Sequence, residues 1–283
     1  MQLDATTAAR LAKVRGYLID MDGTLYIAGG VALPGAVDFV RALDAAGRPR
    51  VVLTNNSSKR GALYVERLSK LGLSVDRAHV LTSGDAAAAW LARESDLRRP
   101  YVLGTAALRE ACARAGLTPT AYADDPDCVL LGYDLELTYR RLSEAALLVA
   151  RGLPYYATHL DLTCIDSEGL LPDAGAIAAA IATTNSFMPG GGPMPTVLGK
   201  PTTAMLDAGL ALLGCSREET LIIGDQLDTD MTLGVAHGVL CALVLTGETD
   251  RAKLARSDVR PDLVAANIGE VFTALRAAGA LPG

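Results

Sequence analysis

Apolar residues in the first fifth of the chain form two short continuous runs separated by a helical repeat. Residues 16–20 are an apolar run that ends on Asp20, and residues 49–54 contain a second run that ends on Thr54. Runs of this length are typical of strands buried on both faces of a parallel sheet. Between them, residues 36–46 carry apolar side chains at the spacing of an amphipathic helix. The pattern therefore predicts a strand, a helix and a second strand.

The same alternation continues along the rest of the chain. Leucines recur on one face over residues 59–71, and Gly72 follows in the position of a helix C-cap. Further strands are predicted over residues 101–104, 128–132, 155–158, 220–225 and 240–245, and further helices over residues 106–115 and 139–151. Strands that alternate with helices in this way predict an α/β fold class with parallel sheets wrapped by helices.

Length and composition indicate an ordered globular protein. The 283 residues suit one large domain or a core with an inserted second domain, and half of them are apolar. The net charge of −6 argues against a nucleic-acid partner, because such proteins need a basic face to neutralise phosphates.

The cellular location is inferred from the cysteines and the apolar stretches. The five cysteines are odd in number and scattered, without metal-ligand spacing, which predicts reduced thiols. Residues 1–15 lack the apolar core of a signal peptide. Residues 174–199 are uncharged, but prolines and glycines interrupt them before the ~20 apolar residues of a bilayer span. We therefore expect a cytoplasmic protein with no membrane partner.

Polar residues end three of the predicted strands, and ligands bind at this edge of open parallel sheets. At the end of the first strand, Asp20 and Asp22 stand two residues apart, just before a glycine. The simplest alternative for this pair is a capping Asp-Gly turn. Residues 25–33 resemble two short strands joined by a turn at Gly29 and Gly30, which predicts a small flap beside the carboxylates.

Three further segments carry hydroxyl, amide or charged groups. Residues 54–58 read Thr-Asn-Asn-Ser-Ser and offer donors suited to a phosphate, although a helix N-cap uses the same residue types. Lys200 lies between a glycine and a proline, and taken alone it is most simply a surface lysine. Asp225 and Asp230 follow a later strand and suit either a hard divalent cation or an acidic turn.

Taken together and in this order, the four segments resemble the motifs of the haloacid dehalogenase superfamily of phosphohydrolases. The Thr-Asn-Asn, Gly-Lys-Pro and Gly-Asp-x-x-x-Thr-Asp sequences are most similar to its NagD-like, 4-nitrophenylphosphatase branch. The resemblance extends over residues 17–246. It implies a Rossmann-like core of parallel strands with an inserted α/β cap domain.

The resemblance also implies roles for individual residues. Asp20 is expected to attack phosphorus, and Asp22 to protonate the leaving alcohol and then to activate water. Mg2+ is expected to be bound by the Asp20 carboxylate, the backbone carbonyl of Asp22 and the Asp225 carboxylate. Asp230 is expected to orient the water ligands of this metal. The residues expected to bind the phosphoryl oxygens are Thr54, Asn55, Asn56 and Lys200.

The resemblance places the catalytic core at residues 1–83 and 194–283 and the cap at residues 84–193. Caps of this branch reach the active site with a loop of the pattern Thr-Asn-x-Asp, followed by a small glycine-rich stretch. In this chain, His159 stands where asparagine is usual and Asp173 where glycine is usual. The expected substrate-specificity residues of the cap are Thr158, His159, Asp161 and Asp173.

These two departures suggest how the cap selects substrates. A carboxylate at Asp173 that lies over the substrate should repel anionic leaving groups and favour neutral or amine-bearing esters. The alternative is that Asp173 caps a helix that starts near Ala174. His159 is either a donor to a substrate hydroxyl or a structural hydrogen-bonding residue.

The function expected from the resemblance is that of a Mg2+-dependent phosphomonoesterase that acts on a small phosphorylated metabolite. Sugar, glycerol, glycolate and nucleotide phosphates all suit the motifs, with 4-nitrophenyl phosphate as an artificial substrate. The alternatives are a phosphotransferase or mutase of the same superfamily and a non-catalytic phosphate-binding relative. The leaving group stays open. The oligomeric state also stays open, with a homodimer as one option.

Overall fold

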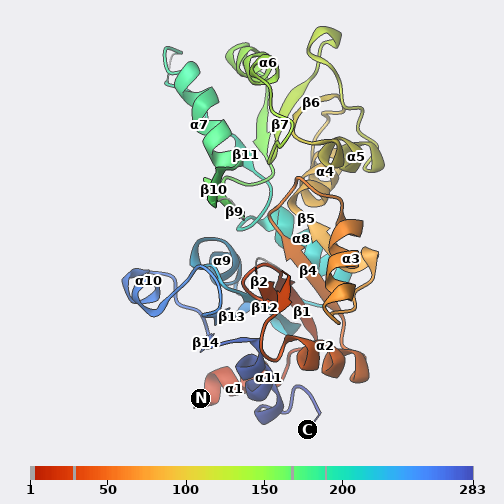
Figure 1. Cartoon of the computed structure of the whole chain (residues 1–283), viewed down its shortest axis with the longest axis vertical. Coiled ribbons are helices and arrows are strands. Elements are labelled where there is room, and N and C mark those ends of the chain that lie inside the picture. The colour runs from red at the N-terminus through yellow and green to blue at the C-terminus, as the bar shows by residue number, and fades with distance from the viewer. Residues whose placement is uncertain (1–3, 28–29, 167–168, 189, 283) are drawn as a thin grey trace. The chain divides into compact units, whose positions relative to one another are not determined.

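The computed structural model describes residues 4–27, 30–166, 169–188 and 190–282, which divide into two compact units (Figure 1). Unit 1 comprises Met1–Thr54, Gly61–Leu81 and Leu206–Gly283, and unit 2 comprises Asn55–Arg60 and Thr82–Met205. The expected cap limits at residues 84 and 193 stay a prediction.

Unit 1 contains a six-stranded sheet with the order β14-β13-β12-β1-β4-β5. Its strands are β1 (Gly16–Asp20), β4 (Arg50–Thr54), β5 (Val80–Thr82), β12 (Thr220–Gly224), β13 (Leu240–Val244) and β14 (Leu263–Ala265). Strand β1 pairs in parallel with β12 on one side and with β4 on the other. The order of the strands reverses beside β1, and this is the position where open parallel sheets bind ligands.

Helices cover both faces of this sheet (Figure 1). On one face, Phe39 of α2 (Ala36–Ala45) meets Tyr17 edge to face, with ring centroids 5.6 Å apart, and α11 (Ile268–Ala277) joins the same core. On the other face, Gly209 of α8 (Thr203–Leu213) packs against Leu18. The other helical elements of this unit are α1 (Ala5–Leu11), α3 (Gly61–Lys70), η1 (Arg77–His79), η3 (Arg217–Glu219), η4 (Leu227–Met231), α9 (Thr232–His237) and α10 (Arg251–Arg256).

Unit 2 contains a four-stranded parallel sheet with the order β11-β8-β7-β6. Its strands are β6 (Pro100–Leu103), β7 (Cys128–Leu131), β8 (Tyr155–Ala157) and β11 (Thr196–Val197). Helices α4 (Ser83–Glu94) and α5 (Ala106–Arg114) pack on one face, and α6 (Tyr139–Ala150) and α7 (Ala174–Thr184) pack on the other. A short helix η2 (Tyr122–Asp124) and an antiparallel hairpin of β9 (Thr163–Asp166) and β10 (Gly169–Pro172) complete the unit.

The predicted α/β fold class with parallel sheets is confirmed. Strand β1 has the predicted bounds, and the other predicted strands and helices differ from the observed ones by at most two residues at either end. The antiparallel pair β2 (Tyr26–Ile27) and β3 (Val31–Ala32) matches the predicted flap. The predicted turn residue Gly29 lies outside the described residues.

All five cysteines are free. In the ranges that the structure describes, no helix combines the length and the hydropathy that a membrane span requires.

Candidate active site

Three buried carboxylates gather at the carboxyl ends of β1 and β12 in unit 1. Oxygens of Asp20, Asp225 and Asp230 all lie within 4.8 Å of one another, and the three residues are 8 %, 2 % and 1 % exposed. Asp20 is the last residue of β1 and Asp225 follows β12, and these two strands are paired neighbours. Because like charges so close and so buried repel one another, the group is suited to a cation.

Two glycines and a backbone amide shape the surroundings of the Asp225 carboxylate. A Cβ atom on Gly247 would lie 1.9 Å from Asp225 Oδ2, and one on Gly23 would lie 2.6 Å from it. The backbone N–H of Glu248 donates to the same oxygen at 2.7 Å, and Thr246 Oγ1 donates to the Gly23 carbonyl at 2.6 Å. Residues 246–248 are not among the site residues predicted from the sequence, although a glycine shortly after a strand end is a usable signal.

Asp230 is held by the turn that follows Asp225. It lies in the π-helical turn η4, and its Oδ2 accepts the backbone N–H of Gln226 at 3.3 Å. A Cβ atom on Gly224 would lie 2.5 Å from Asp230 Oδ2. Glycine at the end of β12 therefore lets the Asp230 carboxylate approach the strand.

The second carboxylate of the first motif is placed differently. Asp22 is exposed, and its Oδ2 accepts the Tyr26 hydroxyl at 3.1 Å. Burial raises the pKa of the Tyr26 phenol, and the Asp22 carboxylate raises it further, so Tyr26 keeps its proton and stays a donor. The Arg67 guanidinium lies over the Tyr26 ring, 4.5 Å from its centroid. Tyr26, four residues from Asp22, is not among the site residues predicted from the sequence.

The polar residues that follow β4 belong to unit 2 and hold Lys200. Asn55 Oδ1 accepts the Lys200 backbone N–H at 2.9 Å, and Asn55 Nδ2 donates to the Lys200 carbonyl at 3.3 Å. Asn56 Oδ1 accepts the backbone N–H of Ser58 at 2.9 Å, so this side chain stabilises a local turn. Lys200 is only 4 % exposed, and the surface-lysine alternative is therefore wrong.

In unit 2, the two residues that depart from the family pattern bind each other. His159 Nε2 lies 3.0 Å from Asp173 Oδ1, and His159 Nδ1 lies 2.9 Å from Thr158 Oγ1. Asp173 is also the N-cap of α7, where its side chain accepts the Ala174 backbone N–H at 2.5 Å. The capping alternative for Asp173 thus describes its geometry. Asp161, the fourth expected residue of the cap, has Oδ2 3.5 Å from Asn55 Nδ2.

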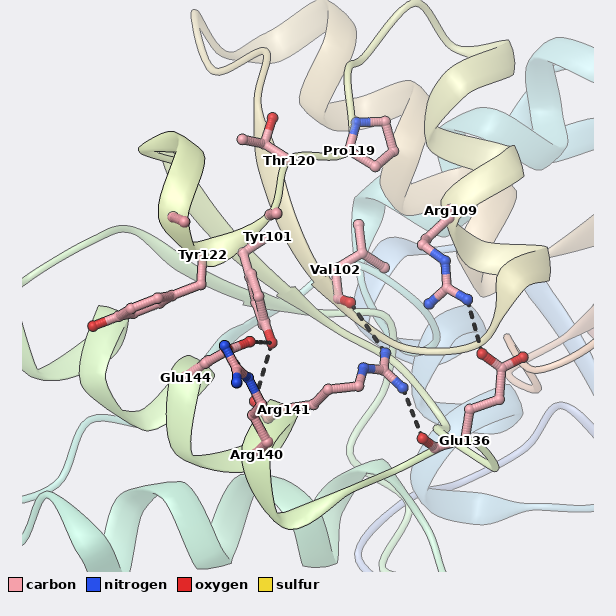
Figure 2. Close-up of a pocket in the computed structure, with 12 residues that line it drawn as sticks. Tyr101, Val102, Arg109, Pro119, Thr120, Tyr122, Glu136, Arg140, Arg141 and Glu144 are labelled. Atoms are coloured by element: carbon pink, nitrogen blue, oxygen red, sulfur yellow. Dashed lines mark hydrogen bonds and ion pairs between the residues drawn. The ribbon is translucent and has the colours of Figure 1, made fainter.

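A cavity of about 550 Å³ lies elsewhere in unit 2, beside β6 (Figure 2). Arg141 reaches across it and donates to the carbonyl oxygens of Val102 and Glu136. The charged side chains around it form the ion pairs Arg109–Glu136, Arg140–Glu144 and Arg141–Asp134. None of the expected site residues is among the described residues that line this cavity. The candidate active site is therefore the carboxylate group at the ends of β1 and β12.

Comparison with known proteins identifies the family. A family model described as haloacid dehalogenase-like hydrolase matches residues 17–118, and a second HAD-like hydrolase model matches residues 197–271. An acid sugar phosphatase of Staphylococcus haemolyticus (strain JCSC1435) is 32% identical over 87% of this chain and 91% of its own length. The chain therefore belongs to the haloacid dehalogenase-like hydrolases, and it is an enzyme of the phosphatase type.

Solved structures resemble the chain over nearly its whole length. The 4-nitrophenylphosphatase of Thermotoga maritima is 37% identical, with a TM-score of 0.85, and the match covers 94% of this chain and 99% of that one. NagD from E. coli K-12 is 30% identical, with a TM-score of 0.82, and the match covers 91% of this chain and 98% of that one. The predicted family and its NagD-like, 4-nitrophenylphosphatase branch are confirmed.

Proposed function

We propose that this enzyme hydrolyses small soluble phosphate esters with Mg2+, through a phosphorylated Asp20. The observation that carries the proposal is the buried group of Asp20, Asp225 and Asp230, whose oxygens lie within 4.8 Å of one another. The names of the relatives, acid sugar phosphatase and 4-nitrophenylphosphatase, support a phosphate ester as substrate. Sugar, glycerol, glycolate and nucleotide phosphates are the proposed ester classes.

The donor atoms of this group suit magnesium. All three side chains offer carboxylate oxygens, which hard cations such as Mg2+ prefer, whereas zinc sites favour histidine and cysteine. The backbone carbonyl of Asp22 is the proposed further ligand. When bound, Mg2+ supplies positive charge that lowers the repulsion between the Asp20 carboxylate and an anionic phosphate.

Asp20 and Asp22 divide the reaction into two displacements at phosphorus. In the first, an Asp20 carboxylate oxygen bonds to phosphorus while the ester oxygen leaves and takes a proton from Asp22. In the second, water attacks phosphorus, its proton returns to Asp22, and phosphate leaves Asp20. The exposure of Asp22 and its hydrogen bond from Tyr26 support this role, because they leave it accessible and oriented.

Phosphate binding is proposed for the residues at the end of β4 and for Lys200. The Thr54 hydroxyl, the backbone N–H groups of Asn55 and Asn56 and the Lys200 ammonium would hold the phosphoryl oxygens as charge redistributes. The side chains of Asn55 and Asn56 are engaged in other hydrogen bonds, so their backbone groups are the proposed donors.

The proposal is tested by measuring phosphate release from a panel of esters. The purified chain is assayed with sugar, glycerol, glycolate and nucleotide phosphates and with 4-nitrophenyl phosphate, each with Mg2+, with Zn2+ and with excess chelator. We expect turnover with Mg2+ and none with chelator. Full activity in chelator, or a clear preference for Zn2+, would contradict the metal assignment, and no release from any ester would contradict the substrate class.

A further inference from the structure

A continuous chain of buried hydrogen bonds crosses unit 2. The Tyr133 backbone N–H donates to Ser57 Oγ at 3.0 Å, and Ser57 Oγ lies 3.1 Å from Thr158 Oγ1. From there the chain runs to His159 and on to Asp173, with contacts of 2.9 Å and 3.0 Å. Thr158 and His159 are fully buried, and Ser57 and Asp173 are 3 % and 5 % exposed.

The members of this chain come from four separate segments. Ser57 follows β4, Tyr133 follows β7, Thr158 and His159 follow β8, and Asp173 begins α7. Imidazole suits the central position, because its two nitrogens point in diverging directions and reach a hydroxyl on one side and a carboxylate on the other. Fully paired buried networks of this kind fix the conformation of the segments they join.

The backbone of the loop after β8 is held by the same helix terminus. The Asp173 N–H donates to the Leu162 carbonyl at 3.0 Å, and the Gly175 N–H donates to the Asp161 carbonyl at 3.0 Å. A Cβ atom on Gly175 would lie 2.3 Å from the Leu160 carbonyl oxygen. Residues 158–162 are thus fixed by side chains at their start and by the first turn of α7 at their end.

The side chain that this loop carries toward the proposed phosphate-binding residues is Asp161. Its Oδ2 lies 3.5 Å from Asn55 Nδ2, and Asn55 forms two hydrogen bonds with the backbone of Lys200. A Cβ atom on Gly199 would lie 2.1 Å from the Thr158 carbonyl oxygen, so the loop and the Lys200 segment are in close contact. A shift of the loop therefore moves Asp161 relative to Asn55 and Lys200.

We propose that His159 and Asp173 are positioning residues that set the place of Asp161, and that they thereby set how efficiently the enzyme turns over phosphate esters. The proposal rests on the proposed function, since Asn55 and Lys200 are taken as parts of the phosphate site. In this role the Asp173 carboxylate is hydrogen-bonded within the protein, to His159 and to the α7 N-terminus. It affects substrates through Asp161.

Two substitutions of Asp173 separate helix capping from the contact with His159. Serine is also a good N-cap residue but is too short to reach His159, so Asp173→Ser keeps the helix cap and removes the hydrogen bond to His159. Asp173→Asn keeps an acceptor for both partners. We expect Asp173→Ser to lower kcat/KM about tenfold on the best ester of the panel, and Asp173→Asn to stay within about twofold of the wild type.

A double-mutant cycle with Asp161→Ala distinguishes positioning from a general loss of structure, because only residues that act through each other give non-additive effects. With Asp161 removed, we expect Asp173→Ser to change kcat/KM less than twofold. The same tenfold loss in both backgrounds would overturn the proposal. If Asp173→Ser does not fold, Thr158→Val, which removes the hydroxyl that links His159 to Ser57, enters the cycle in its place.

The dissociation constant of inorganic phosphate in the presence of Mg2+ gives a readout that does not need turnover. If the Asp173 and Asp161 substitutions change phosphate binding non-additively but the protein hydrolyses no ester, the result would contradict the proposed function and support the positioning role. If the protein hydrolyses esters and the Asp173 and Asp161 substitutions have additive effects, the result would support the function and overturn the positioning role.

Discussion

The carboxylate group of unit 1 and the hydrogen-bond chain of unit 2 use acidic residues in opposite ways. In unit 1, Asp20, Asp225 and Asp230 bring three like charges within 4.8 Å, an arrangement that a bound cation stabilises. In unit 2, Asp173 is paired with His159 and with the α7 N-terminus. Substitutions in the first region should therefore change metal dependence and chemistry, whereas those in the second should change geometry and stability.

The largest effect is expected at the nucleophile. Asp20→Asn keeps the shape of the side chain but removes the attacking carboxylate, so turnover should fall to background, which for phosphate ester hydrolysis is extremely slow. Phosphate release is the measurement, and circular dichroism checks that the variant is folded. Asp228→Asn is the matched control, because Asp228 lies in the fourth motif with a side chain that is 78% exposed and should leave activity nearly unchanged. Near-normal turnover by folded Asp20→Asn would refute the mechanism.

The next effect is expected at Gly247, which touches a carboxylate from outside the motifs. The Cβ of Gly247→Ala would lie 1.9 Å from Asp225 Oδ2 and must displace that carboxylate. We expect the Mg2+ concentration for half-maximal activity to rise about 10–100-fold, as for other residues that orient metal ligands. Gly269→Ala serves as control for a tight glycine away from the carboxylates, since the nearest neighbours of its Cβ would be Asn267, Gly35 and Pro34. An unchanged Mg2+ requirement would show that residues 246–248 do not hold Asp225.

In unit 2, the comparison predicts a loss of stability instead of a loss of chemistry. Arg141 pairs at 2.9 Å with Asp134, whose side chain is fully buried, so Arg141→Met leaves a buried carboxylate without its cation. The free energy of unfolding should fall by about 3 kcal/mol. The side chain of the adjacent Arg140 is 86% exposed. Changing it to methionine should lower the free energy of unfolding by less than about 0.5 kcal/mol. Denaturant titration measures both, and equal losses would contradict the distinction.

The smallest effect is expected at Tyr26, which orients the proposed acid without reacting. Tyr26→Phe removes the hydrogen bond to Asp22 and should lower kcat about threefold to tenfold. Because the pKa of Tyr26 is raised, the phenol stays protonated up to pH ~10, and the ratio of wild-type to variant kcat should be constant across pH 7–9, above the ordinary titration range of carboxyl groups. Tyr17→Phe is the control, since Tyr17 Oη has no hydrogen-bond partner among the described residues. A ratio that changes with pH in this range would argue against Tyr26 as a permanent donor.

Much of the fold was predictable because the buried strands are continuous apolar runs. Strand β1 is buried at every position and was predicted at its observed bounds. Helix α4 was not assigned, because the four consecutive alanines of residues 86–89 give little contrast between its faces. Hairpin β9–β10 was missed for a different reason, since β10 is mostly exposed and shows no alternation of buried and exposed positions.

The candidate site was predictable only where its residues are local in sequence. Asp20 and Asp22 form a short motif at a strand end, and a family resemblance could be seen there. The contact of Gly247 with Asp225 joins residues 22 positions apart, and that of His159 with Asp173 joins residues 14 positions apart. Such contacts depend on how strands and helix termini meet in the folded chain, which no local pattern records.

The assignment of residues 55–60 to unit 2, one peptide bond after Thr54 of unit 1, has a consequence for recombination between relatives. A chimera that exchanges only residues 84–193 would combine the Ser57 of one parent with the Thr158 of the other, and the Asn55 of one with the Asp161 of the other. The part of the sequence that must be exchanged together is therefore discontinuous. We expect productive exchanges of unit 2 to carry residues 55–60 and 82–205 together.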